Sequence, residues 1–329
     1  MLDQSGQHAR KVMEMLSGNA AAQSEIVASW KRCVSLHNLS PERDVHTEIM
    51  TQFELRQAFD PLERYIQIAE TDLQALARFV APMGFFVSVS DGKGTALLHR
   101  GALPKSGSVM RKIRDGMMWR EDLQGTNAIG TGLFVRHPIA IHVGEHFFAS
   151  NYLLTCLVAP LYDPFGRSLG AVNIASPNTG FDRTLTSVLL GTLVTTAQHI
   201  ESRLLRFSYP NTLIVSLPDS AAIDGSIPLV AVDPDFNVVG ATHAVRCSYG
   251  VTNQALETGI SVGRFFPDVG VEGSSLAQAE KVALERALNV ADQCVSLAAT
   301  RLGISRATMH RKMRAHCLLR KKNLKRRDT

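Results

Sequence analysis

Residues 153–176 read LLTCLVAPLYDPFGRSLGAVNIAS, and they carry the strongest signal for the fold class. Two apolar runs lie on either side of the turn residues DPFG, so the sequence predicts a β-hairpin. A second pair of short runs, FFVSVSDGKGTALLH at residues 85–99, surrounds Asp91, Gly92 and Gly94 and predicts another hairpin. PIAIHV at 138–143 is typical of a further strand, and Asp182 to Phe207 has helical spacing. Antiparallel strands flanked by helices predict an α+β domain.

With the segments on either side of this domain, the sequence predicts a multidomain α+β chain. Residues 1–75 form a helical lead-in, with Leu55, Phe59 and Leu62 at helical spacing, and the sheet domain covers 76–207. SYPNTLIVSLPDSAAIDGS is rich in Pro, Ser, Asp and Gly and predicts a linker over 208–226. Two short strands around DPDFN indicate a smaller unit at 227–267. A second linker, 268–275, precedes an all-α segment at 276–329.

The charge of the chain is unevenly distributed. The net charge is +5, yet residues 276–329 hold 13 Lys and Arg against 4 Asp and Glu, while the rest holds 22 against 26. A basic end beside a mildly acidic body is typical of a chain in which one module neutralises phosphates. No apolar run is long enough to span a membrane and no signal peptide is evident, so we expect a cytoplasmic protein without a membrane partner. Five scattered cysteines argue against a disulfide framework or a zinc ribbon.

The basic segment has the pattern of a helix-turn-helix. Helices are expected at 276–292, 296–302 and 306–316, with Gly303 in the turn and Ser305 as the N-cap of the third helix. Small and apolar side chains pack the last two helices together: Ala298, Ala299, Leu302 and Ile304. The third helix is expected to lie in the major groove of double-stranded DNA. Its candidate contacts are Ser305, Arg306, Thr308, His310, Arg311, Lys312 and Arg314, and those of the RKKNLKRR run beyond it are Lys321, Lys322 and Arg326.

These residues carry a resemblance to a known family. AATRLGISRATMHRKMRAH, residues 298–316, resembles the C-terminal helix-turn-helix of the Fis type. Asp292, Gln293 and Cys294 stand where that family has a Gly-Asn pair. The resemblance implies a homodimer, and the helix at 276–292 has an apolar face for which the sequence shows no other partner.

The sheet domain carries a second resemblance. WREDLQGTNAIGTGL at 119–133, GEHF at 144–147, the hairpin at 153–176 and SWKRC at 29–33 resemble the N-terminal GAF domain of acetoin, glycerol and dihydroxyacetone metabolism regulators, over residues 24–206. This implies a GAF-like sensor with a small-molecule effector. The residues expected to line its pocket are Trp119, Asn127, His142, Glu145, His146 and Cys156. A purely structural role for the glycine-rich GTNAIGTG motif stays open. Residues 227–267 resemble the first half of a PAS domain.

One motif is typical of an enzyme. His142, Glu145 and His146 spell HxxEH, a zinc-peptidase spacing that requires a helix, but a strand precedes the motif and Gly144 interrupts it. No GxSxG, no GxGxxG after a strand and no cluster of Cys and His ligands is evident. We therefore expect no catalysis, no metal and no cofactor.

Regulators with this type of GAF domain usually hold an AAA+ ATPase before the helix-turn-helix. The chain has no GxxxxGK[ST] phosphate loop and no GAFTGA loop, which predicts regulation by occupying DNA without ATP hydrolysis. Two alternatives stay open. An interaction protein would hetero-oligomerise with a full-length sigma-N activator, and an architectural DNA-binding protein would ignore small molecules. The large sensor region weighs against the second alternative.

Overall fold

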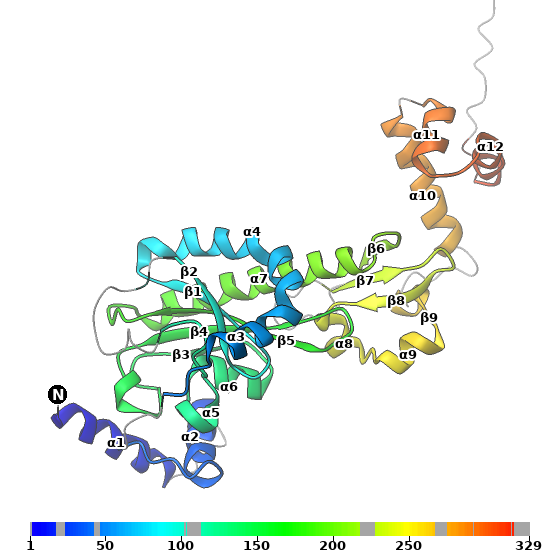
Figure 1. The fold of residues 1–329 in the computed structure, drawn as a ribbon. Coiled ribbons are helices and arrows are strands. Elements are labelled where there is room, and N and C mark those ends of the chain that lie inside the picture. The colour runs from blue at the N-terminus through cyan, green and yellow to red at the C-terminus, as the bar shows by residue number, and fades with distance from the viewer. Residues whose placement is uncertain are drawn as a thin grey trace, which may run out of the picture. The chain divides into compact units, whose positions relative to one another are not determined.

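The computed structural model describes residues 2–17, 24–42, 47–101, 103, 113–217, 228–266, 275–291, 293–316 and 318 (Figure 1). The chain divides into two compact units, Met1–Ser261 and Val262–Thr329. None of the helices in the described part of the chain has the length and apolar character that crossing a membrane requires.

The centre of the first unit is a five-stranded sheet in the order β2-β1-β5-β4-β3, with every pair antiparallel. Its strands are β1 (Phe86–Ser90), β2 (Ala96–Arg100), β3 (Ile139–Ile141), β4 (Thr155–Tyr162) and β5 (Ser168–Ser176). The hairpins expected around DGKGT and DPFG are β1-β2 and β4-β5. Helices flank this antiparallel sheet, so the α+β prediction is confirmed (Figure 1).

Helices cover both faces of this sheet. On one face α4 (Glu63–Val80) and α7 (Arg183–Ser208) pack on alternate strand residues that include Val87, Leu157 and Ile174. The intervening residues face the opposite side, where α6 (Ala128–Val135) packs on β3, β4 and β5 and follows the short α5 (Glu121–Gln124). This alternation follows from the two-residue period of a strand.

The expected helical lead-in consists of α1 (Leu2–Leu16), α2 (Glu25–Ser35) and α3 (Gln52–Phe59), with 3-10 turns η2 (Asp60–Leu62), η3 (Ala81–Met83) and η5 (Ala149–Asn151) in the same unit. α3 begins with a capping box, since the Thr51 hydroxyl accepts the Glu54 N–H and the Glu54 carboxylate accepts the Thr51 N–H. α4 continues without a break across the boundary expected between residues 75 and 76.

A second sheet in the order β6-β7-β8-β9 completes the first unit. Its elements are β6 (Leu213–Ser216), β7 (Leu229–Val232), β8 (Asn237–Ala241), α8 (His243–Tyr249), α9 (Asn253–Thr258) and β9 (Ile260–Ser261). β6 lies inside the segment expected to be a linker, and all four of its residues pair with β7. The Pro, Ser and Gly residues around β6 are typical of a linker, so the composition did not predict a strand there. Pairing with β7 depends on residues outside this segment and leaves no periodic pattern within it.

Three hairpin turns share one design. Each begins with an aspartate, Asp91, Asp163 or Asp233, whose carboxylate accepts the backbone N–H groups of the residues two and four positions further on. The residue three positions after the aspartate has a positive φ in all three turns. Two of these residues are glycines, and the third is Phe236 with a φ of 65°.

The second unit begins with the 3-10 turn η6 (Val262–Phe265) and contains α10 (Ser275–Val290), α11 (Val295–Arg301) and α12 (Arg306–Ala315). Ala298 and Ala299 are buried together with Met309 and Met313 in one core that Leu302 and Ile304 border, so the expected packing of the last two helices is confirmed. Gly303 has a φ of 64°, as its place in the turn requires. Gln293 has a φ of 63° in the turn after α10, where the Fis family has its Gly-Asn pair.

The apolar face of α10 packs in part within its own unit, while Ala283 on this helix is exposed. Leu284, Ala287 and Leu288 are buried in the same core as α11 and α12. Their partner therefore lies within the unit. The sequence could not show this, because an apolar face looks the same whether it packs on its own chain or on a second copy.

Candidate DNA-binding surface and sensor pocket

Helix α12 presents a basic surface. Arg306, Arg311 and Arg314 are exposed, and His310 and Thr308 are partly exposed. Met309 and Met313 anchor the opposite side of the helix in the core. The Ser305 hydroxyl accepts the Thr308 N–H at 3.1 Å and caps the helix, as expected. Exposed guanidinium groups on a helix anchored in this way are suited to contact base edges and phosphates.

The predicted DNA contacts differ in how they are held. Lys312 donates a hydrogen bond to the Glu280 carboxylate of α10, and His316 Nε2 lies 2.6 Å from the other oxygen of that carboxylate. These two hydrogen bonds, with Lys312 contributing most, lower the pKa of Glu280 below its usual value. Lys321, Lys322 and Arg326 lie outside the described residues.

A pocket lies on the sheet face that α6 covers in the first unit, and polar side chains form a row beneath it. The strand register places His99 of β2 opposite Ser88 of β1, and Ser88 opposite Asn173 of β5. Directly opposite residues of antiparallel strands point to the same face. Asn173 Nδ2 donates a hydrogen bond to Ser88 Oγ at 3.1 Å. Three polar groups from three strands thus meet in one line.

One of these polar groups leaves hydrogen-bonding capacity for a ligand, and another is held by a neighbouring carboxylate. Asn173 is 4% exposed, and its Oδ1 has no hydrogen-bond partner among the described residues. A buried acceptor without a partner is costly, so a ligand that donates a hydrogen bond there is favoured. His99 Nδ1 donates to the Asp115 carboxylate at 2.5 Å, which orients the imidazole ring.

The walls of the pocket are apolar. Three of the six predicted lining residues, Trp119, Asn127 and Cys156, line it together with Phe86, Ile113, Ala128, Ile129, Leu154 and Ala175. Its empty volume is about 360 Å³, a figure that includes the open solvent at its mouth. Burial raises the pKa of Cys156 to about 12, so this thiol is neutral and acts as part of the apolar wall.

Asn127 lines the pocket, but its amide is already used by the protein. It is the N-cap of α6, where Oδ1 accepts the Gly130 N–H at 2.9 Å. Its Nδ2 donates to the carbonyl oxygens of Trp119 and Gly125 at 2.9 and 2.8 Å. The side chain therefore fixes the GTNAIGTG turn, and little polar capacity is left for a ligand.

His142, Glu145 and His146, the other three predicted lining residues, do not line this pocket. They lie in the loop after β3, not on a helix, and the Glu145 carboxylate accepts the His142 N–H at 2.7 Å. His146 is fully buried, and burial lowers the pKa of its imidazole to about 3. His8 of α1 donates to the His146 carbonyl oxygen at 2.8 Å. The N-terminal helices α1 and α2 therefore pack against this loop.

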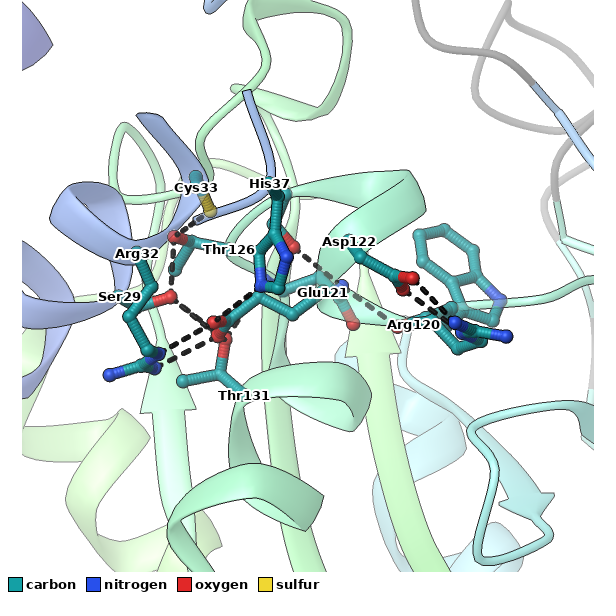
Figure 2. A network of polar contacts seen from close by, with 12 residues as sticks. Ser29, Arg32, Cys33, His37, Arg120, Glu121, Asp122, Thr126 and Thr131 are labelled. Carbon is teal, nitrogen blue, oxygen red and sulfur yellow. Dashed lines mark hydrogen bonds and ion pairs between the residues drawn. The ribbon is translucent and has the colours of Figure 1, made fainter. Parts of the chain in front are cut away.

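A buried polar network joins two of the distinctive motifs, SWKRC and WREDLQGTNAIGTGL. Figure 2 shows the Glu121 carboxylate at its centre, where it accepts hydrogen bonds from Ser29 and Thr131 at 2.7 and 2.8 Å. Arg32 binds both oxygens of that carboxylate at 2.8 and 3.0 Å, and Ser29 also contacts the Thr126 hydroxyl at 2.7 Å. The network fixes α2 against α5 and α6 and gives the motifs a structural role beside the pocket.

Sequence reasoning missed both the polar row and this network. The available signals were the alternation of Ser88 with valines in FFVSVS and the lone Asn173 in AVNIAS, since a polar residue inside an apolar strand is unusual. Among the described residues, no group of three or more His, Cys, Asp or Glu side chains is placed to hold a metal ion.

Comparison with known proteins finds matches both for the helices at 275–316 and for most of the chain. The model of bacterial regulatory proteins of the Fis family matches residues 275–316. The acetoin catabolism regulatory protein of Cupriavidus necator is 28% identical over 237 residues, which cover 70% of this chain and 35% of that protein. AcoR of Bacillus subtilis, the transcriptional activator of the acetoin dehydrogenase operon, is 25% identical over 241 residues. The match covers 73% of this chain and 39% of AcoR. The chain thus spans less than half the length of these relatives.

Among solved structures, the crystal structure of the E.coli DhaR(N)-DhaL complex is similar, with a TM-score of 0.48 and 16% identity over 73% of this chain and 80% of that chain. The relatives are transcription regulators, and the matched helices α10 to α12 are the DNA-binding type expected from the sequence. The chain is thus similar to the acetoin catabolism regulators, and its residues 275–316 carry a helix-turn-helix of the Fis type.

Proposed function

We propose that this protein binds specific DNA sites through α12 and alters transcription in response to a small effector. The observation that carries DNA recognition is the exposed arginine surface of α12 on a helix anchored by Met309 and Met313. The regulator acts as a homodimer on two half-sites, as the Fis-type module implies. It works in the cytoplasm, where its DNA is, and it neither catalyses a reaction nor hydrolyses ATP.

The effector occupies the pocket above His99, Ser88 and Asn173. Its apolar walls favour a small uncharged molecule, and the unpartnered Oδ1 of Asn173 favours one that carries a hydroxyl group. Two relatives are named for acetoin metabolism, so acetoin, a small uncharged hydroxyketone, is the first effector to test.

The test of DNA recognition separates residues that read bases from residues that bind phosphates. Replacing Arg306 or Arg311 by Ala is expected to weaken a duplex selected for tight binding by roughly 1 to 3 kcal/mol and to weaken a scrambled duplex far less. Replacing Lys321 and Lys322 by Ala weakens both duplexes about equally and flattens the dependence of log affinity on log salt. Titrations of both duplexes at several salt concentrations measure this, and their stoichiometry counts the chains per site. Equal losses on both duplexes for all four variants would contradict sequence-specific recognition by α12.

A further inference from the structure

One carboxylate of α10 holds two basic side chains of α12. Glu280 binds Lys312 through one oxygen and His316 through the other, and Lys312 and His316 lie one helical turn apart. The three side chains are not equally exposed. Those of Glu280 and Lys312 are 34% and 32% exposed, whereas that of His316 is 10% exposed. The Glu280 carboxylate therefore links one side of α12 to α10.

The exposed arginines of the same helix are not held in this way. Within the described residues, Arg306, Arg311 and Arg314 form no ion pair, while Lys312 forms one. The lowered pKa of Glu280 keeps its carboxylate ionised at neutral pH. A phosphate that approaches Lys312 must therefore displace a charged partner, whereas one that approaches Arg311 displaces only water.

From this difference we propose that Glu280 is a specificity-determining residue of the DNA-binding module. It competes with the DNA backbone for Lys312 and so limits the number of sequence-independent phosphate contacts that α12 makes. Affinity for phosphates raises the binding of every duplex, whereas base contacts raise only that of the cognate site. By withholding one cation, Glu280 increases the ratio of cognate to random binding. The inference rests on the proposed role of α12 in DNA binding.

The test compares Glu280→Gln with Glu285→Gln in the full chain. Both variants remove one negative charge from α10, and Glu285 is exposed. A duplex of scrambled sequence is titrated at several salt concentrations, so the measurement does not depend on knowing the operator. For E280Q the slope of log affinity against log salt is expected to steepen by about 0.9, the value for one additional phosphate contact on duplex DNA. Affinity for the scrambled duplex rises several-fold, and for E285Q the slope stays that of the wild type.

The double variant E280Q/K312Q identifies the group that is released. If Lys312 provides the new phosphate contact, this variant returns the slope to the wild-type value. If Glu280 only supports the structure of the unit, E280Q weakens binding to every duplex without steepening the slope, and this result would overturn the proposal. Thermal unfolding followed by circular dichroism checks that each variant is folded.

Glu280→Asp provides a second variant in case E280Q does not fold. This variant keeps the negative charge but places it one methylene group further from Lys312. We expect a slope between those of the wild type and E280Q. A slope equal to that of the wild type would count against the proposal. Binding to a duplex selected for tight binding distinguishes failure of the proposed function from failure of the role of Glu280. Loss of sequence preference in the wild type contradicts the proposed function, whereas an unaltered cognate-to-random ratio in E280Q contradicts only the role of Glu280.

Discussion

His146 shows how burial fixes the protonation state of one residue. Its side chain is fully buried, and neither ring nitrogen has a partner among the described residues. Burial lowers the pKa to about 3, whereas in the unfolded chain the imidazole takes up a proton near its ordinary pKa of about 6.5. Between these pH values the unfolded state binds more protons than the folded state. The stability that neutral His146 contributes is therefore complete above the unfolded pKa and is lost as the pH falls below it.

Replacing His146 by Leu is expected to reduce the loss of stability between about pH 7 and pH 5, because the variant no longer contributes a proton uptake on unfolding. Urea unfolding at the two pH values measures the difference, and the same substitution at exposed His199 is the control. The pKa values of His8 and His243 are also lowered, so the His146 variant still loses some stability as the pH falls. The raised pKa of Glu201 acts in the opposite direction, which is why variants are compared with the wild type. A loss in the His146 variant as large as that of the wild type would contradict this account.

The structure brings some of the residues expected to line a pocket together and separates the others. Trp119 and Cys156 lie in or beside distinctive motifs and line one pocket, whereas His142, Glu145 and His146, selected by the same reasoning, do not line it. What separates the two groups is long-range packing, since His8 contacts a residue 138 positions away. No local pattern contains that information.

At the scale of elements, α6 packs on the sheet at a distance that excludes a larger side chain. A Cβ atom on Gly132 would lie 2.3 Å from Cγ1 of Val158, a buried residue of β4. Gly191 of α7 offers a contrast, because a Cβ atom there meets nothing within 4 Å. The glycines of GTNAIGTG are thus required by packing, while a glycine elsewhere in the unit is not.

Replacing Gly132 by Ala is expected to destabilise the first unit by about 1 to 3 kcal/mol, since β4 or α6 has to move. Replacing Gly191 by Ala is expected to stabilise it by roughly 0.5 to 1 kcal/mol, because alanine loses less backbone entropy in a helix. Denaturant unfolding gives both values. Equal effects of the two substitutions would show that close packing of α6 does not determine the fold of this motif.

The hairpins were predictable from sequence, and the polar row of His99, Ser88 and Asn173 was not. DPFG and DGKGT specify their turns through an aspartate that accepts two backbone N–H groups, and this is a local interaction. The polar row depends on β1 lying between β2 and β5, which brings Ser88 next to Asn173 across 85 residues of chain. Strand order is a property of the whole sheet, so no single strand encodes it.

At the scale of the whole molecule, the pocket proposed to bind the effector and the helix α12 proposed to read DNA belong to separate compact units, each with its own core. A regulator that responds to an effector needs a coupling free energy between these sites. If the effector changes the affinity for DNA by some factor, DNA must change the affinity for the effector by the same factor. Both tryptophans of the chain, Trp30 and Trp119, lie in the first unit, and only Trp119 lines the pocket.

This reciprocity can be measured with one fluorescent reporter. In a Trp30→Phe variant the remaining fluorescence comes from Trp119, so acetoin titrations monitored in this way report occupancy of the pocket. We expect saturation with the selected duplex to change the apparent affinity for acetoin by about 5- to 150-fold, the usual range of allosteric coupling, and DNA titrations with and without acetoin to give the same factor. Adding Asn173→Ala weakens acetoin binding because the polar row loses its acceptor, whereas Asn178→Ala, an exposed amide after β5, leaves it intact. If DNA left the affinity reported by Trp119 unchanged while acetoin still altered DNA binding, the effector would act at another site, because one pair of linked sites cannot couple in a single direction.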